Sequence, residues 1–155
     1  MEICLYEPMI AQNAGTLTRL CACFNIPISI IEPASFIIGC REFKRAGMDY
    51  IDKTSVNLYS SFYNYKNIKE NSRIILLDTK ANNMYYDFIF EKNDCLIVGS
   101  ESTGVPDDVY NECEYKVKIP MNNNTRSLNV AISAAIVLSE ALRQNKYFTL
   151  NSKSE

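Results

Sequence analysis

The chain of 155 residues contains no histidine and no tryptophan. The absence of histidine removes the commonest general base, the Ser-His-Asp and Cys-His nucleophile systems, and zinc sites that use imidazole. None of the six cysteines forms a C-x-x-C pair, so neither a zinc knuckle nor a redox motif is expected. We therefore expect no metal, and any chemistry must use another proton acceptor or none.

Signals for secretion and for membrane insertion are also missing. The chain opens Met1-Glu2 without a basic segment, and no apolar run approaches the ~18 residues that span a bilayer. Four cysteines, Cys4, Cys21, Cys23 and Cys95, lie in apolar surroundings. We interpret these four as small buried hydrophobes of a reducing compartment, and expect a cytoplasmic protein without membrane contact.

The composition favours one ordinary globular α/β domain over residues 1–155. Apolar residues make up 47% and charged residues 22%, and the net charge of −2 excludes a strongly basic nucleic-acid coat but not a local basic patch. The first third is predicted to form a βαβ unit and hence a parallel sheet. We expect strands at 3–6, 28–31, 73–78, 94–99 and 115–120. Helices are expected at 17–24, at 40–46, from Pro106 and at 127–145. The stretch 52–71 shows only weak periodicity, and a frayed tail is expected at about 146–155.

Three loops, at 13–19, 99–106 and 119–130, have a composition typical of ligand sites. In open α/β sheets, ligands bind beyond the carboxyl ends of the strands. Gly15 lets the backbone pass close to a neighbour, Arg19 falls one turn into a helix, and Ser127 is a natural N-cap for the long helix. The loops match neither a Walker loop nor the dinucleotide fingerprint. On pattern alone, a simpler interpretation remains open for each loop. The loop at 13–19 can be a plain helix start, the loop at 99–106 a generic glycine-rich turn, and Ser127 a capping residue only.

Five motifs in register carry a resemblance that covers nearly the whole chain, from Leu5-Tyr6-Glu7-Pro8 to about Arg143. They are Ile31-Glu32-Pro33, Arg45-Ala46-Gly47-Met48-Asp49-Tyr50, Gly99-x-Glu101-x-x-Gly104-Val105-Pro106, Ile119-Pro120-Met121 and Arg126-Ser127-Leu128-Asn129. Together they resemble the SPOUT superfamily of RNA methyltransferases and, within it, the minimal single-domain tRNA (cytidine/uridine-34)-2'-O-methyltransferase family.

The resemblance implies an enzyme with a mostly parallel sheet, flanking helices and a C-terminal trefoil knot. It also implies a homodimer whose RNA site spans both subunits, a tRNA substrate, and S-adenosylmethionine as cofactor. By position, the cofactor residues are Leu77, Gly99, Glu101, Gly104, Ile119, Met121, Ser127 and Leu128.

The same resemblance assigns Arg19 to activation of the ribose 2'-hydroxyl. A guanidinium almost never loses its proton, so we favour a positioning role for Arg19, with the proton passing late to phosphate or water. The candidate RNA contacts are Arg41, Lys44, Arg45, Arg126 and Asn129, with Lys66 and Lys69 as further options and Tyr59, Tyr63 and Tyr65 as either stacking or core residues.

Three positions depart from the pattern of the relatives. Thr103 stands where an arginine is common, Ile132 where an asparagine is common, and Ser139 where a tyrosine often lies. The first departure weakens the case for identical RNA contacts. Two alternatives therefore stay open: methylation of another RNA ribose, and a non-catalytic RNA-binding or nucleotide-binding protein of the same fold. A third, an unrelated flavodoxin-like or Rossmann domain, predicts an unthreaded C-terminus and a phosphate at residues 99–104.

Overall fold

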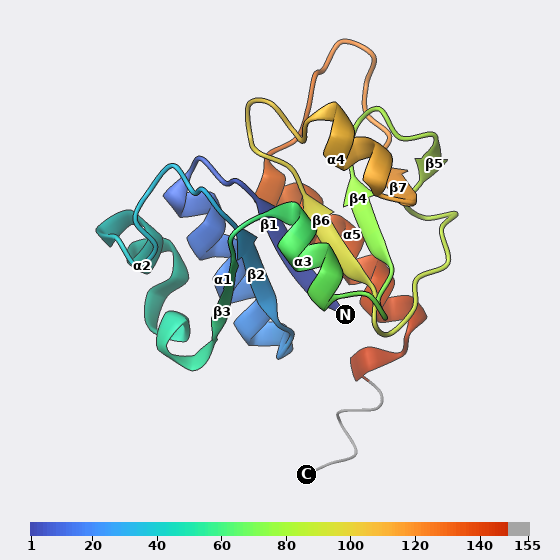
Figure 1. The fold of residues 1–155 in the computed structure, drawn as a ribbon. Coiled ribbons are helices and arrows are strands. Elements are labelled where there is room, and N and C mark those ends of the chain that lie inside the picture. Colours follow the sequence, from blue (N-terminus) through green and yellow to red (C-terminus); the bar gives the residue numbers. More distant parts are fainter. Residues whose placement is uncertain (149–155) are drawn as a thin grey trace.

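A seven-stranded sheet runs through the computed structural model, which describes residues 1–148 without the side chains of residues 52 and 53 (Figure 1). Its strand order is β3-β2-β1-β6-β4-β7-β5, and every neighbouring pair is parallel. The predicted parallel α/β sheet is thus confirmed. The strands are β1 (Glu2–Tyr6), β2 (Ile28–Ile31), β3 (Val56–Tyr59), β4 (Ile74–Leu77), β5 (Asn83–Met84), β6 (Cys95–Val98) and β7 (Tyr115–Lys118).

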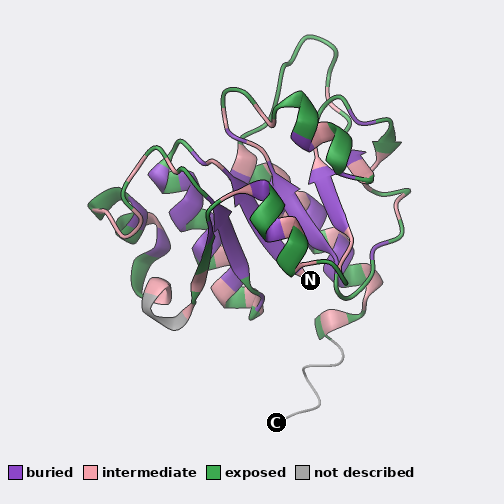
Figure 2. Ribbon diagram, viewed as in Figure 1, coloured by how far each residue is buried: buried purple, intermediate pink, exposed green. Residues whose placement is uncertain are grey.

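Helices cover both faces of this sheet, because alternate residues of each buried strand point to opposite sides. Ile3 and Leu5 share a core with helices α1 and α5, whereas Cys4 and Tyr6 share one with α3 and α4. Figure 2 shows the strands buried between these layers. The helices are α1 (Ala11–Phe24), α2 (Arg41–Gly47), the 3-10 helix η1 (Met48–Lys53), α3 (Phe62–Ile68), α4 (Asp107–Glu112) and α5 (Val130–Gln144).

The starts of two helices differ from the sequence prediction. The first helix was expected at 17–24, with a loop from residue 13, but α1 begins at Ala11, and Ile10 at its N-cap makes no side-chain capping bond. The long helix was expected to begin at Ser127, but α5 begins at Val130 with Asn129 as its N-cap. The prediction that Ser127 caps this helix is therefore wrong. Asn129 accepts hydrogen bonds from the N–H groups of Ala131 and Ile132 instead.

The predictions for the stretch 52–71 and for the burial of the cysteines also need correction. β3 and α3 lie where the sequence showed little periodicity, because β3 is an edge strand that buries only Tyr59 fully. Cys4, Cys21 and Cys95 are buried as predicted, but Cys23 is exposed, so the prediction of a buried cysteine is wrong there. Cys113 is buried, and burial raises the pKa of its thiol to about 11.

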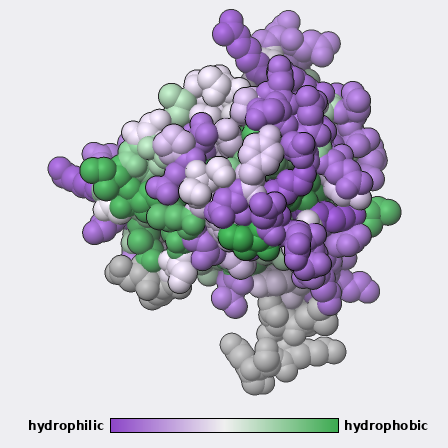
Figure 3. Space-filling model, viewed as in Figure 1, coloured by the Kyte–Doolittle hydropathy of each residue, from purple (hydrophilic) through white to green (hydrophobic). Residues whose placement is uncertain are grey.

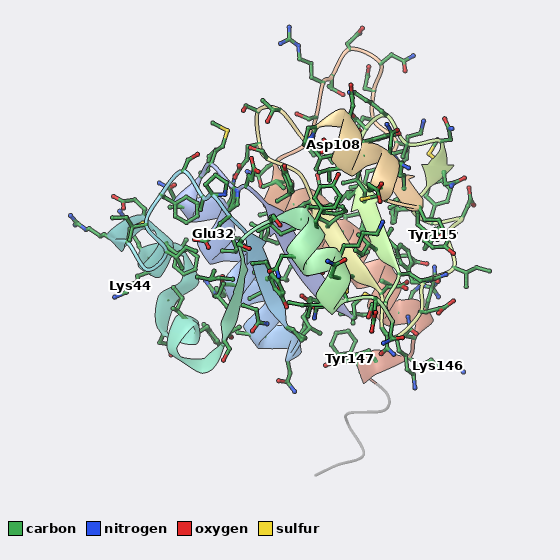
Figure 4. All side chains as sticks on the ribbon, in the orientation of Figure 1. Glu32, Lys44, Asp108, Tyr115, Lys146 and Tyr147 are labelled. Atoms are coloured by element: carbon green, nitrogen blue, oxygen red, sulfur yellow. The ribbon has the colours of Figure 1, made fainter. Side chains whose placement is uncertain are left out.

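Residues 146–148 belong to the stretch that was predicted to be a frayed tail. They pack onto the body: the Tyr147 hydroxyl donates to the carbonyl of Asn25 at 3.0 Å, and the ring of Phe148 meets that of Phe24. Figure 4 labels Lys146 and Tyr147 at this end of α5. The rest of the predicted tail, 149–155, lies outside the described residues. No helix in the described part of the chain is long and apolar enough to cross a membrane.

Candidate active site at the carboxyl ends of the central strands

A cavity of about 550 Å³ opens beyond the carboxyl ends of β4, β6 and β7. The loops that follow these strands form its walls, and residues from the start of α1 close one side. The loop after β7 rises above the body in Figure 1, and this end of the molecule is largely hydrophilic in Figure 3. All eight predicted cofactor residues line the cavity: Leu77, Gly99, Glu101, Gly104, Ile119, Met121, Ser127 and Leu128.

The loop after β6 is a tight turn that requires both of its glycines. Ser100 and Gly104 exchange two backbone hydrogen bonds of 2.9 and 2.8 Å. A Cβ on Gly99 would come within 2.6 Å of the Gly104 backbone, and Gly104 has a φ of +68°, which disfavours any side chain. The turn thereby holds residues 101–103 at the rim of the cavity.

The side chain of Glu101 is bound to the protein. Its carboxylate accepts hydrogen bonds from the N–H of Met9 at 2.7 Å, the N–H of Ile10 at 3.3 Å and Nδ2 of Asn13 at 3.1 Å. A carboxylate at this place satisfies free N–H groups at the start of α1 and is favoured by the helix dipole. Glu101 thus binds the two residues immediately before α1 and one side chain of its first turn.

Asn13 extends this connection to the third loop. Its Oδ1 accepts a hydrogen bond of 3.0 Å from Nδ2 of Asn129, whose own Oδ1 caps α5. Glu101, Asn13 and Asn129 thus join the β6 loop, α1 and α5 in one chain of bonds. Asn13 was not among the predicted site residues, although its place in the loop expected at 13–19 was a usable signal.

Arg19 does not line this cavity. It lies exposed on α1, with its guanidinium carbon 5.7 Å from the centre of the Tyr50 ring. It lies six positions beyond Asn13, about 9 Å along the helix axis. The structure thus separates the predicted catalytic residue from the predicted cofactor residues of the same chain.

The predicted RNA contacts fall into two places. Arg126 and Asn129 line the cavity, and Arg126 is exposed. The other three cations, Arg41, Lys44 and Arg45, are exposed on α2, whose Lys44 lies on the outer side of the helix in Figure 4.

The further candidates for RNA contact, two lysines and three tyrosines, are placed differently. Lys66 pairs with Glu112, and Lys69 pairs with the buried Glu2. Tyr59 and Tyr65 are buried, whereas Tyr63 is exposed. The two buried rings therefore belong to the core.

The cavity has the chemistry of a nucleoside site. Leu77, Ile119 and Leu128 offer apolar walls, while the surrounding turns offer backbone groups and carboxylates. Its volume falls in the usual range for small-molecule sites of about 300–1,000 Å³. Among the described residues, no group of three or more cysteine, aspartate or glutamate side chains is placed to hold a metal ion.

Comparisons with known proteins agree on one family. Residues 1–139 match the model of the SpoU rRNA Methylase family. A tRNA (cytidine(34)-2'-O)-methyltransferase of Beijerinckia indica is 47% identical over 144 residues, which cover 92% of this chain and 90% of that protein.

Solved structures show the same architecture. One, from work on the 2-OH methylation of C/U34 on tRNA, has a TM-score of 0.89 at 32% identity and covers 94% of this chain and 95% of its own. The SpoU methyltransferase AviRb of Streptomyces viridochromogenes, in complex with AdoMet, has a TM-score of 0.86 at 21% identity. It covers 94% of this chain and 57% of its own, and it shares the fold.

Proposed function

The chain belongs to the SpoU rRNA methylase family, and from that premise we propose that it methylates the 2'-oxygen of the wobble nucleotide, cytidine or uridine 34, of tRNA. S-adenosylmethionine is the methyl donor. The observation that carries this proposal is the 47% identity, over most of both chains, to a tRNA (cytidine(34)-2'-O)-methyltransferase. The family model matches residues 1–139, a span that contains every residue lining the cavity.

The cavity residues would hold the cofactor by shape and by main-chain groups. Leu77, Ile119 and Leu128 supply an apolar slot that suits an adenine, and the 99–104 turn brings backbone groups to the adjoining ribose. Gly99, Glu101, Gly104, Met121 and Ser127 complete the proposed site. When bound, S-adenosylmethionine supplies a methyl group activated by a positively charged sulfur. The protein's share of catalysis is therefore mostly alignment and exclusion of water.

Arg19 is proposed to hold the ribose oxygen and a neighbouring phosphate of the RNA. Its planar fork of N–H donors suits such paired contacts, and it stays charged at any working pH. The hydroxyl proton then leaves late, to phosphate or to water. The chain's lack of histidine agrees with a mechanism that needs no strong base.

Arg19 does not line the cavity of its own chain, so a second copy of the chain would supply the Arg19 that acts at each cavity. We therefore propose a homodimer with composite active sites. Exposed apolar side chains beside the cavity support a contact there: Met9, Ile10, Leu128 and Ile132 are 40 to 55% exposed. Mixing an Arg19→Ala variant with a Gly104→Val variant tests this arrangement. Restored activity in the mixture is expected, and two inactive parents that stay inactive together contradict it.

The RNA contacts are proposed to be few, because the chain as a whole is acidic. Arg41, Lys44 and Arg45 on α2, together with Arg126 and Asn129 at the cavity, form the proposed surface. The affinity for tRNA should fall with rising salt, with a slope that reflects only a few phosphates. An affinity that ignores salt would contradict this surface.

The C-terminal segment is proposed to be threaded as a trefoil knot. Two features support it: β7 lies between β4 and β5 near the sheet edge, while α5 returns to pack on α1 and β6. The connecting loop borders the same cavity as the loops after β4 and β6. Pulling the unfolded chain by its ends tests the threading, since a knotted chain stops short of its full contour length.

Mapping the methylated nucleotide is the decisive test of function. Purified protein, S-adenosylmethionine and an anticodon stem-loop should give one added methyl group at nucleotide 34, located by mass spectrometry. A matched RNA with a 2'-deoxy sugar at position 34 should give none. Methylation at another nucleotide would point to a different RNA, and binding of RNA without methyl transfer would point to a non-catalytic protein.

A further inference from the structure

Asp78 stands in the cavity wall immediately after β4. Its N–H donates to the carbonyl of Val117 on β7 at 3.0 Å, which holds the backbone in place. Oδ1 of its side chain accepts the N–H of Lys80 at 2.8 Å. Oδ2 lies opposite the glycine turn, 3.7 Å from the position of a Cβ on Gly104. The carboxylate is therefore fixed between two of the three loops that form the cavity.

Asp78 differs from Glu101, the other carboxylate in the cavity wall, in the partners available to it. Glu101 receives three donors from α1 and its approach. Asp78 receives one, and in the described part of the chain no side chain forms an ion pair with it or donates to Oδ2. A carboxylate accepts hydrogen bonds and donates none, so a ligand that satisfies Oδ2 must bring a donor or a positive charge.

We infer that Asp78 accepts hydrogen bonds from the ribose hydroxyls of the bound methyl donor, an inference that rests on the proposed function. Asp78 directly follows Leu77, part of the proposed apolar slot for the adenine, and the ribose is the part of the nucleoside attached to that base. Its two adjacent hydroxyls are donors that one carboxylate can receive. The ammonium group lies at the opposite end of the cofactor, away from the base.

The substitution D78N tests the inference without dismantling the turn, because the asparagine Oδ1 still accepts from the Lys80 N–H. D78S, whose hydroxyl can accept the same bond, provides a second variant. D87N is the matched control: it makes the same charge change at an exposed aspartate outside the cavity. Circular dichroism and thermal midpoints establish that the variants fold.

Calorimetric titration of S-adenosylmethionine, S-adenosylhomocysteine and methylthioadenosine gives the readout. D78N and D78S should weaken all three by a similar factor of about ten, the loss of one hydrogen bond to a charged group, while D87N binds like the wild type. A 2',3'-dideoxy form of methylthioadenosine should bind the wild type and D78N equally.

Three results would overturn the inference. Unchanged affinities in D78N and D78S would show that the carboxylate touches no ligand. A loss limited to S-adenosylmethionine and S-adenosylhomocysteine would assign Asp78 to the amino-acid end, and a persisting loss for the dideoxy compound would exclude the ribose. If the wild type bound none of the ligands, the proposed function would fail as well, whereas wild-type binding with unaffected variants would remove only the role of Asp78.

Discussion

Asn13 and Asn129 are 116 residues apart in the chain, yet Nδ2 of Asn129 donates a hydrogen bond of 3.0 Å to Oδ1 of Asn13. Through this bond the end of the β7 loop, at the N-cap of α5, is attached to the first turn of α1. Glu101 binds Asn13 from the other side. The β6 loop and the end of the β7 loop are therefore both held against the start of α1 by the protein itself, before any ligand contributes.

The cap and the Asn13 contact of Asn129 can be separated by substitution. Asn129→Ala removes both and should lower the free energy of unfolding by about 1–2 kcal/mol, while Asn129→Ser keeps a cap and should lose less. Urea unfolding measures the stability change of each variant. All curves are recorded at one protein concentration, because the stability of a dimer depends on concentration. Equal midpoints for wild type and both variants would show that neither contact contributes.

Glu101→Gln should destabilise the protein by about 1–2 kcal/mol and weaken cofactor binding. A glutamine presents one oxygen and one NH₂ to three donors, so at least one donor at the start of α1 loses its partner. Chemical unfolding and calorimetry report the two effects. Glu114→Gln, at an exposed site away from the cavity, is the control and should change neither quantity.

Gly15→Ala should destabilise the packing of α1 on α2. An added Cβ would lie 2.3 Å from the carbonyl oxygen of Phe43 and 2.9 Å from the Cβ of Ala46. Overpacking costs about 1–3 kcal/mol, which outweighs the ~1 kcal/mol that alanine gains over glycine in a helix. The exposed Thr16→Ala on the same helix should be nearly neutral. A Gly15→Ala variant with unchanged stability would mean that the two helices can separate freely.

Arg19→Lys should lower the turnover number about 100-fold and leave the affinity for S-adenosylmethionine unchanged, because Arg19 is proposed to contact the RNA and does not line the cofactor cavity of its own chain. Lysine keeps the charge but lacks the fork of donors that orients two oxygens. Single-turnover rates across pH, with calorimetry in parallel, measure the two effects. A near-normal rate whose pH profile moves to lower pH would instead support Arg19 as a base.

Glu140 should contribute to stability in a pH-dependent manner. Hydrogen bonds from Arg143 and Gln144 lower the pKa of its carboxyl from 4.5 to about 2. Because the folded value is the lower one, the contribution is complete above about pH 4.5 and disappears as the pH falls towards 2.

The size of this effect should be below about 1 kcal/mol, since solvent screens the pair. Wild type should exceed Glu140→Gln in stability at pH 7, and the two should converge near pH 2. Parallel unfolding curves measured at each pH give the comparison. A stability difference that stayed constant from pH 7 to pH 2 would exclude ionisation of Glu140 as the cause.

The sequence located five of the seven strands, because β1, β2, β4, β6 and β7 are short apolar runs with clear stops. It missed β3 and β5, an edge strand and a two-residue strand, whose partly exposed residues show little alternation. It also placed the start of α1 too late. The carboxylate that binds the N–H groups just before this helix belongs to Glu101, some 90 residues away, so no local pattern marks the boundary.

Local residue chemistry was enough to determine that this is a parallel α/β protein without histidine chemistry, with polar loops at 99–106 and 119–130. Only the tertiary structure decided that these two loops share one cavity with the start of α1, that Asn129 rather than Ser127 caps α5, and that Arg19 lies apart from the cavity of its own chain. The physical reason is that periodicity and turn residues act over a few neighbours. A cap or a cavity wall, in contrast, depends on groups brought together by packing across the whole sheet.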